Sequence, residues 1–312
     1  MKIAIAQIAP VWLDRAATLA KITAYVGDAA KGGADLVVFG ETILPGYPFW
    51  LDGTGGARFN DPMQKELFRH YATEAVCIEE GMLDVLCSRC NELNIAVIVG
   101  IVERPLDRGG TSVYCSLVYI DKSGAIRNVH RKLQPTYEER LVWSPGDGHG
   151  LRTFPIEGFR LGGLNCWENW MPLPRAALYG QGETLHVAIW PGNVRNTEVL
   201  TRFLAREGRS YCVSVGGLMR PEDVPEGVPF RDEIIGSMGA MPADGGSCLA
   251  NPDGSWLIEP VVGKEALLFA EIDPNEVLRE RQNFDPSGHY SRPDVTKLTI
   301  DRTRQSILEI KD

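Results

Sequence analysis

The feature that most constrains the fold is a series of short, almost wholly apolar runs separated by segments of helical periodicity. The run Leu36-Val37-Val38-Phe39 is apolar at every position, and residues 2–9 and 95–102 are similar in character. Runs of this length and composition are typical of strands covered on both faces of a sheet. Between them, residues 15–30 carry apolar side chains on one helical stripe that ends at Gly32-Gly33, so we expect a helix there.

The rest of the chain continues this alternation. Helical periodicity returns across about residues 62–93, and apolar runs around turn residues predict two hairpins, at 112–131 and 246–258. Residues 219–245 hold several prolines, glycines and mixed charges, and we interpret them as one long loop. Further strands are expected at 158–165, 185–190, 211–218 and 266–272, and further helices at 172–181 and 196–210. No linker or internal repeat divides the chain, so we expect mixed sheets with outer helices, in a layered α/β or α+β sandwich of a single domain.

Composition narrows the classes of function. The 312 residues are 44% hydrophobic and 23% charged, which is ordinary for a globular protein. The net charge of −9 argues against a nucleic-acid-binding surface, which needs a basic patch. Seven cysteines at irregular spacings argue against a disulfide framework and favour a reducing compartment. The apolar N-terminal run is too short for a signal peptide, and no run approaches the roughly 18 apolar residues of a membrane helix. We therefore expect a cytoplasmic protein that binds neither nucleic acid nor membrane.

Glu41 is the first residue in the chain whose position is not explained by packing in a hydrophobic core. It follows the apolar strand that ends at Phe39 and precedes a loop rich in proline and glycine. A carboxylate at the end of a buried strand is desolvated unless it is paired, which raises its pKa and makes it a candidate base. The alternative is a glutamate that caps a turn or forms a structural salt bridge.

Lys132 and Cys166 are the other two candidates. Lys132 leaves a hairpin strand just before Pro135, although a basic residue there could equally be a solvated charge. Cys166 ends a strand that contains Gly162 and Gly163, and a helix is expected soon after it. The N–H groups at such a turn favour thiolate, whereas most single cysteines are small core side chains. Each signal is weak when it stands alone.

Together, Glu41, Lys132 and Cys166, in that order and each within an extended motif, resemble the nitrilase superfamily, hydrolases that use a Glu-Lys-Cys triad. The resemblance covers almost the whole chain. Cys166-Trp167-Glu168-Asn169 is similar to the nitrilase branch, whereas aliphatic amidases and carbamoylases usually carry Tyr and Asp after the cysteine. The runs Arg131–Arg140 and Gly288–Asp294 also resemble that branch. One departure is Gly40, where the family commonly has proline.

The resemblance implies a fold and an activity. The fold is a four-layer α-β-β-α sandwich, with residues 1–280 as the carbon–nitrogen hydrolase domain and residues 281–312 as a tail involved in subunit contacts of a homo-oligomer. The activity is hydrolysis of an organic nitrile to a carboxylic acid and ammonia, through a thioimidate and a thioester on Cys166. The resemblance also implies a second glutamate, matched by Glu139, that holds Lys132 and assists proton transfer.

Three aromatic residues are candidates for substrate binding: Tyr47, Trp167 and Trp190, each of which could equally be a core residue. We expect no cofactor and no metal. The C-x-x-C of Cys87 and Cys90 lies on a helical stripe without a second pair, the histidines are scattered, and the remaining cysteines are expected to be core side chains. Two alternatives to a nitrilase stay open: an amidase or carbamoylase with the same triad, and an inactive binding protein.

Overall fold

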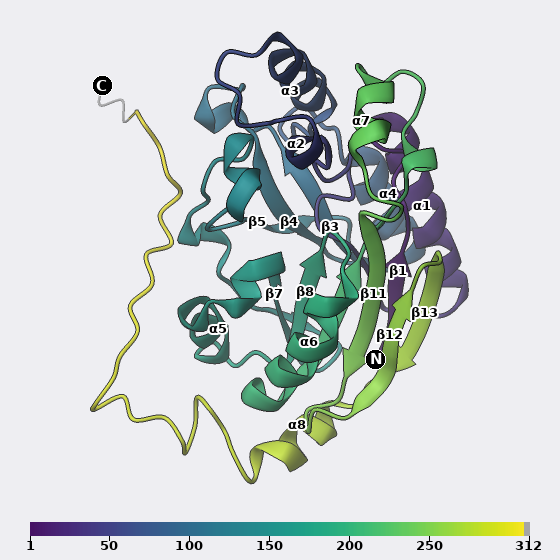
Figure 1. Cartoon of the computed structure of the whole chain (residues 1–312). Helices are drawn as coiled ribbons and strands as arrows, with labels where there is room; N and C mark the ends of the chain where they lie inside the picture. The colour runs from purple at the N-terminus through teal and green to yellow at the C-terminus, as the bar shows by residue number, and fades with distance from the viewer. Residues whose placement is uncertain (309–312) are drawn as a thin grey trace.

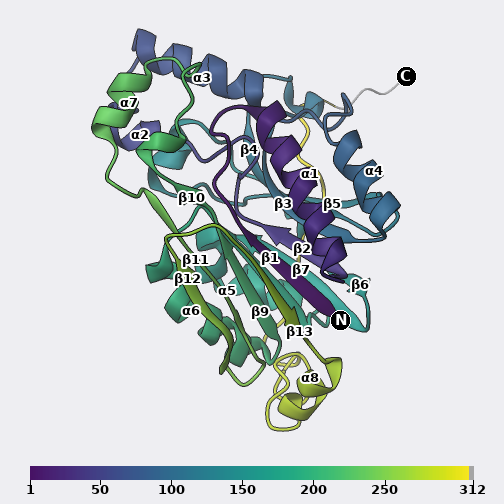
Figure 2. The same ribbon diagram turned by 90° about the vertical axis from the view of Figure 1, so that its right-hand side faces the viewer.

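The computed structural model describes residues 1–308 and contains two β-sheets packed face to face between helices (Figures 1 and 2). In the first sheet the order is β13 (Ala266–Glu271), β1 (Lys2–Gln7), β2 (Leu36–Phe39), β3 (Ala96–Glu103), β4 (Tyr114–Ile120) and β5 (Ile126–Arg131). Strands β1, β2 and β3 are parallel, and the others in this sheet pair antiparallel.

The second sheet has a similar plan. Its order is β10 (Leu218–Met219), β11 (Ala243–Ala250), β9 (Tyr211–Gly216), β8 (Leu185–Trp190), β7 (Phe159–Asn165) and β6 (Phe154–Ile156), with β12 (Trp256–Val262) paired to β11. Strands β7, β8 and β9 are parallel, so the two sheets share a parallel centre flanked by antiparallel strands. This arrangement of chain segments agrees with the expected mixed sheets.

Alternation along the strands sorts their side chains between two environments. Ile3 and Ile5 of β1 pack between the sheets, in a cluster that includes Val187 of β8, whereas Ala4 and Ala6 face the helices. The first sheet is covered by α1 (Arg15–Lys31) and α4 (Asp84–Leu93), and the second by α5 (Pro172–Tyr179) and α6 (Val194–Gly208) (Figure 2). The predicted four-layer α-β-β-α sandwich is therefore confirmed.

The helical prediction for residues 62–93 is wrong in its middle. Two helices, α3 (Pro62–Glu74) and α4, are separated by a stretch of extended backbone and turns. Val76 pairs with the end of β3: its N–H donates to the Val102 carbonyl oxygen at 2.7 Å, and its own carbonyl oxygen accepts from Arg104 N–H at 2.8 Å. Main-chain groups committed to a neighbouring strand cannot also form helical hydrogen bonds, and periodicity alone does not reveal that commitment.

The prediction of one long loop over residues 219–245 is also wrong in part. The segment contains the last residue of β10, a short helix, α7 (Arg231–Ser237), and the start of β11. Ile234 of α7 is buried beside Trp50 and Leu51 of the short helix α2 (Trp50–Gly53). Tertiary burial of a single apolar side chain thus stabilises a helix that is too short to be recognised from its periodicity. The predicted hairpins, in contrast, are present as β4–β5 and β11–β12.

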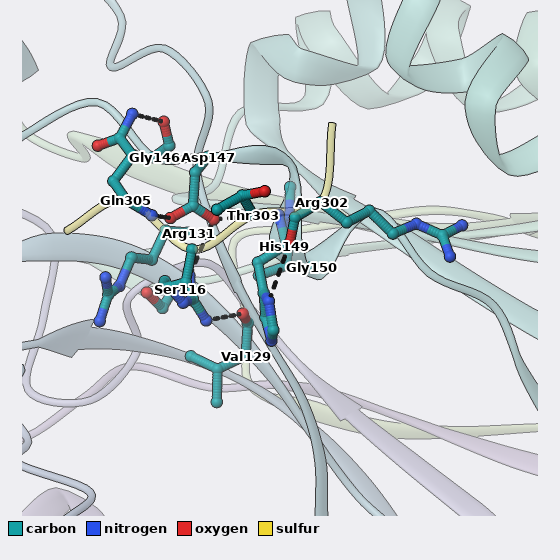
Figure 3. A network of polar contacts seen from close by, with 12 residues as sticks. Ser116, Val129, Arg131, Gly146, Asp147, His149, Gly150, Arg302, Thr303 and Gln305 are labelled. Atoms are coloured by element: carbon teal, nitrogen blue, oxygen red, sulfur yellow. Dashed lines mark hydrogen bonds and ion pairs between the residues drawn. The ribbon is translucent and has the colours of Figure 1, made fainter. Parts of the chain in front are cut away.

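Residues 282–308, which follow α8 (Pro274–Arg281), lie along the surface without helix or strand (Figure 1). Residues 300–305 dock onto the loop after β5, where Asp147 accepts hydrogen bonds from the Arg304 guanidinium at 3.1 Å and from Gln305 N–H at 3.0 Å (Figure 3). A role for residues 281–312 in subunit contacts stays a prediction, and residues 309–312 lie outside the described part. Within residues 1–308, no helix is long and apolar enough to cross a membrane.

Candidate active site

The three residues of the expected triad leave three strands that are far apart in the sequence. Glu41 follows β2, Lys132 follows β5, and Cys166 follows β7, which belongs to the other sheet. The sheets are joined at this point, because Glu41 N–H donates to the main-chain oxygen of Trp190, at the end of β8, at 3.0 Å. The packing of the two sheets therefore brings the three side chains together at one end of the sandwich.

Lys132 lies between two carboxylates. Its Nζ is 3.0 Å from Glu41 Oε1 and 2.8 Å from Glu139 Oε2, and all three side chains are buried. Side-chain donor atoms of Glu41, Glu139 and Cys166 lie within 4.8 Å of one another. Such a set of donors could hold a metal ion, but here the ammonium group of Lys132 is the cation bound to the two carboxylates. Two of its three N–H groups are used in this way, which leaves one to face a reacting group.

Glu139 is fixed at the start of a short 3₁₀ turn, Tyr137–Leu141. Its Oε2 accepts from Thr136 N–H at 2.6 Å, and its Oε1 accepts from the Tyr47 hydroxyl at 2.9 Å. Glu138, by contrast, lines the neighbouring cavity and is only partly buried. The geometry thus places Glu139, and not its equally acidic neighbour, beside Lys132, as the sequence motif indicates.

Cys166 occupies a sharp turn between β7 and the 3₁₀ segment Cys166–Trp170. Its φ of +42° lies in the left-handed region, which is strained for a residue with a side chain and is often found at a nucleophile on a strand-to-helix turn. The Asn169 side-chain amide supports the turn by donating to the Cys166 carbonyl oxygen at 2.8 Å. The turn directs the thiol toward the Glu41 and Glu139 carboxylates. The next residue, Trp167, lines the same cavity as Cys166.

The ionisation of the Cys166 thiol depends on burial and on the charges around it. Burial raises the pKa of Cys166 well above its usual value, and repulsion from Glu41 and Glu139 adds to the increase. Lys132 and the Trp167 N–H act in the opposite direction but do not overcome burial. The Trp167 N–H lowers the pKa of Cys166, in the direction expected for a turn amide, but burial outweighs this effect and favours the protonated thiol.

Glu41 has the ionisation that its position at the end of β2 predicts. Burial raises its pKa to about 7; Lys132 acts against this increase and Glu139 adds to it. The pKa of Lys132 lies well above its usual value: burial lowers it, but attraction to Glu41, Cys166 and Glu139 outweighs that effect, so the group stays an ammonium. Within residues 1–308, Glu41 Oε2 has no hydrogen-bond partner. It is the oxygen available to accept a proton.

Two residues that support Glu41 were missed by the sequence interpretation. Cys115, expected to be a core side chain only, is buried with its Sγ 3.4 Å from Glu41 Oε1. Gly100 in β3 lies where a Cβ atom would be 2.4 Å from the Gly40 carbonyl oxygen and 2.7 Å from Glu41 Cα. A glycine within an otherwise apolar strand is a signal for such a close approach of two backbones.

A cavity of about 540 Å³ opens above Cys166. Tyr47 and Trp167 line it, and their role in substrate binding stays a prediction. The Trp190 side chain does not contribute to the described lining: it is fully buried beside Leu200 and Cys212 and donates to Ser214 Oγ at 3.2 Å. Its place in the structure favours a packing role, because β8 points the ring toward α6. Residues around the end of α7, such as Ser237 and Met238, complete the wall, which the interpretation of 219–245 as a loop did not foresee.

Comparison with known proteins agrees with this geometry. Residues 2–282 match the family described as carbon-nitrogen hydrolase. The chain belongs to that family. Among its relatives, Nitrilase 2 from an unknown prokaryotic organism is 37% identical over 99% of this chain and 95% of its own length. An aliphatic nitrilase from Rhodococcus rhodochrous is 34% identical over 96% of this chain and 82% of its own.

Solved structures show the same fold at much lower identity. A carbon-nitrogen hydrolase from Helicobacter pylori G27 is 19% identical, with a TM-score of 0.71 over 94% of this chain and 96% of that one. An amidase from Nesterenkonia sp. is 18% identical, with a TM-score of 0.65 over 91% of this chain and 94% of that one. At this identity the likeness concerns the arrangement of the chain and not the substrate.

Proposed function

We propose that this carbon–nitrogen hydrolase is a nitrilase that converts an organic nitrile to its carboxylic acid and ammonia, with Cys166 as nucleophile. The observation that carries the proposal is the buried Glu41–Lys132–Glu139 cluster, which meets the Cys166 thiol beneath a cavity of about 540 Å³. The relatives named nitrilases, which span nearly the whole chain, support the choice of a nitrile over other carbon–nitrogen bonds.

In the first half of the reaction, Glu41 takes the proton of the Cys166 thiol while the sulfur attacks the nitrile carbon. Negative charge develops on the nitrile nitrogen. The remaining N–H of Lys132 and the Trp167 backbone N–H are the donors suited to stabilise it. Return of the proton from Glu41 to that nitrogen gives a thioimidate, in which carbon is bonded to sulfur.

In the second half, Glu41 removes a proton from a water molecule that adds to the thioimidate carbon. Protonation of the nitrogen then breaks the carbon–nitrogen bond and releases ammonia, which leaves a thioester on Cys166. A second water, activated in the same way, releases the carboxylic acid and restores the thiol. A carboxyl group with a pKa of about 7 can serve as base and acid in turn near neutral pH.

The nearest rival is an amidase with the same four residues, and the two activities are separated by assaying a nitrile beside its own amide. A nitrilase releases ammonia from the nitrile faster than from the amide, whereas the reverse order would overturn the proposal. Cys166→Ala is the control: turnover should disappear while the circular dichroism spectrum is unchanged. Ammonia release by the folded variant would exclude Cys166 as the nucleophile.

The cavity also supports a class of nitrile. Its wall includes the aromatic rings of Tyr47, Phe49 and Trp167, whereas Asp52 and Glu138 contribute negative charge. No lysine or arginine occurs in the part of the lining that the structure describes. Aromatic or arylaliphatic nitriles without a negative charge fit this wall, because an anionic substituent would be repelled. A phenylacetonitrile should be hydrolysed faster than its ring-carboxylated analogue. Glu138→Gln should reduce this difference in rate, because it removes one of the negative charges that repel the carboxylate.

Assembly and compartment complete the proposal. Trp170, Leu173 and Phe203 are exposed by 57%, 63% and 49% on α6 and the segments around α5, which supports a second copy of the chain as partner. A particle mass equal to the monomer would contradict a homo-oligomer.

All seven cysteines are free, which supports a reducing compartment such as the cytoplasm.

A further inference from the structure

Glu168, two residues after the nucleophile, is a buried charged group that the proposed reaction does not use. It is 1% exposed and is not among the described residues that line the cavity. Burial alone would raise its pKa, but His130 and the N–H groups of Leu133 and Asn165 hold the pKa below its usual value. Glu168 is therefore a carboxylate that is enclosed by protein and has no access to substrate.

Both of its oxygens accept hydrogen bonds, and the donors come from two separate parts of the site. Oε1 accepts from Leu133 N–H at 2.7 Å, and Oε2 accepts from Asn165 N–H at 2.8 Å. His130 Nε2 lies 3.1 Å from each oxygen. Leu133 directly follows Lys132, and Asn165 directly precedes Cys166. One carboxylate therefore joins the main chain beside the ammonium to the main chain beside the thiol.

This link crosses between the two sheets. Lys132 follows β5 at the edge of the first sheet, and Cys166 follows β7 of the second sheet, so no strand pairing fixes one relative to the other. Packed apolar side chains allow small shifts, whereas two short hydrogen bonds to a single rigid carboxylate do not. Displacement of a reacting group by about 1 Å is enough to reduce a rate by about 100-fold.

We propose that Glu168 is a positioning residue that sets the separation between the Lys132 ammonium and the Cys166 thiol by holding the main chain beside both. The inference rests on the proposed function, in which these two groups act on the same substrate atoms. It also gives a physical meaning to the glutamate of the Cys166-Trp167-Glu168 motif: an aspartate, one methylene shorter, cannot reach both N–H groups from this turn.

The decisive variant is Glu168→Gln. Glutamine has nearly the same shape, but one of its terminal atoms is an NH₂ donor, which would face the N–H of either Leu133 or Asn165. We expect kcat to fall about 10- to 100-fold, as for other residues that orient a reacting group, with little change in KM. Alkylation of Cys166 by iodoacetamide should require a higher pH, because a displaced Lys132 no longer lowers the pKa of the thiol.

Glu103→Gln is the matched control for the loss of a buried carboxylate. Glu103 is 4% exposed and accepts from the Arg131 guanidinium at 3.0 and 2.8 Å, next to Lys132 in the sequence, and it has no hydrogen bond to the cysteine turn. Thermal unfolding of both variants measures their stability. A purely structural role predicts that both lose stability and that each folded molecule keeps its kcat and its alkylation profile. That result for Glu168→Gln, or an equal loss of kcat in Glu103→Gln, would overturn the inference.

Two further arms keep the test decisive. If Glu168→Gln does not fold, Glu168→Asp keeps the charge but is too short to span both N–H groups, so its kcat should still fall. Wild-type kcat in that variant would refute the positioning role. If the wild-type protein hydrolyses neither nitriles nor amides, the proposed function fails. The alkylation profile of Cys166 still reports on Lys132 in that case, and an unchanged profile in Glu168→Gln refutes the inference separately.

Discussion

The four buried side chains at the centre of the site control one another's ionisation. Glu41 and Glu139 share the single ammonium of Lys132, so one negative charge remains uncompensated within hydrogen-bond distance. That excess charge, together with burial, raises the pKa of Glu41 to about 7 and keeps the Cys166 thiol protonated. In the proposed reaction, the proton therefore moves from sulfur to Glu41 as the substrate is attacked.

The pH dependence of the reaction follows from Glu41. Below about pH 7 its carboxylate is protonated and cannot accept the thiol proton, so kcat/KM should fall as the pH drops through that value. The stability of the fold depends on pH in the opposite direction. Because the pKa of Glu41 is higher in the folded state, its contribution to the free energy of unfolding decreases as the pH rises. A profile of kcat/KM, recorded with circular dichroism at each pH, tests this expectation. A flat profile across neutral pH would exclude Glu41 as the base.

Glu139 and Glu138 provide a paired test of the motif. Glu139→Gln removes the charge that helps to hold Lys132 and to raise the pKa of Glu41. We expect turnover to fall by at least about tenfold, as for other residues that orient a reacting group, and the acid limb of the pH profile to move to lower pH. Glu138→Gln should retain turnover with an uncharged nitrile. Kinetics of both purified variants test this expectation. An unchanged acid limb in Glu139→Gln would contradict the interaction of the Glu139 charge with Lys132 and Glu41.

At the scale of elements, the site depends on how closely neighbouring strands approach. Gly100 of β3 allows the main chain of Gly40 and Glu41 to lie against β3, where a Cβ atom would be 2.4 Å from the Gly40 carbonyl oxygen. The backbone then turns at Thr42, whose φ is +44°. The carboxylate of Glu41 is thus placed by a contact between two strands of one sheet, and the thiol by a turn that leaves the other.

Gly100→Ala tests the importance of this contact. The added methyl group has to push the backbone of Glu41 away from β3, and a displacement of about 1 Å is enough to reduce kcat by about 100-fold. Gly227→Ala is a suitable control, because a Cβ atom at position 227 meets nothing within 4 Å. Wild-type turnover in Gly100→Ala, measured beside the control, would show that the strand can shift without moving the carboxylate.

At the scale of the whole molecule, the chain after α8 returns across the surface to the loop that follows Lys132. Gly146 N–H donates to the Lys132 carbonyl oxygen at 2.8 Å, and the Gly146 carbonyl oxygen accepts from the Gln305 side chain at 3.2 Å. Arg304 reaches both Asp147 and the Val129 carbonyl oxygen, the latter at 3.1 Å. The C-terminal segment therefore covers the outer side of the loop whose inner side supports the active site.

Arg304→Met measures the strength of this docking. It keeps much of the side-chain bulk but removes the charged partner of the buried Asp147 carboxylate, so we expect a loss of about 1–3 kcal/mol in the free energy of unfolding. Arg302→Met is the control, because the Arg302 side chain points away from the contacts (Figure 3) and only its main-chain oxygen faces His149. Chemical denaturation of both variants gives the comparison. Equal stability of the two would mean that the guanidinium contributes nothing to docking.

The sequence by itself determined the class of layers and indicated which side chains meet at the candidate site. Apolar runs bounded by turn residues predicted the strands, because burial on both faces of a sheet leaves a local record in composition. Glu41, Lys132 and Cys166 gave only weak signals singly, and it was their order within extended motifs, which resembles the nitrilase superfamily, that singled them out. Glu139 was distinguished from Glu138 by its motif, and the capping arrangement at Thr136 explains that choice.

Only the tertiary structure decided how these residues behave. The pKa of Cys166 depends on two carboxylates from other strands and on burial, so the local preference for thiolate at a turn was outweighed. The extended segment around Val76, the helix α7 and the contact of Cys115 with Glu41 all depend on partners distant in sequence. The link through Glu168 belongs to the same class. Periodicity and motifs record what a residue is and which face it occupies, whereas distances between segments are set by the packing of the two sheets.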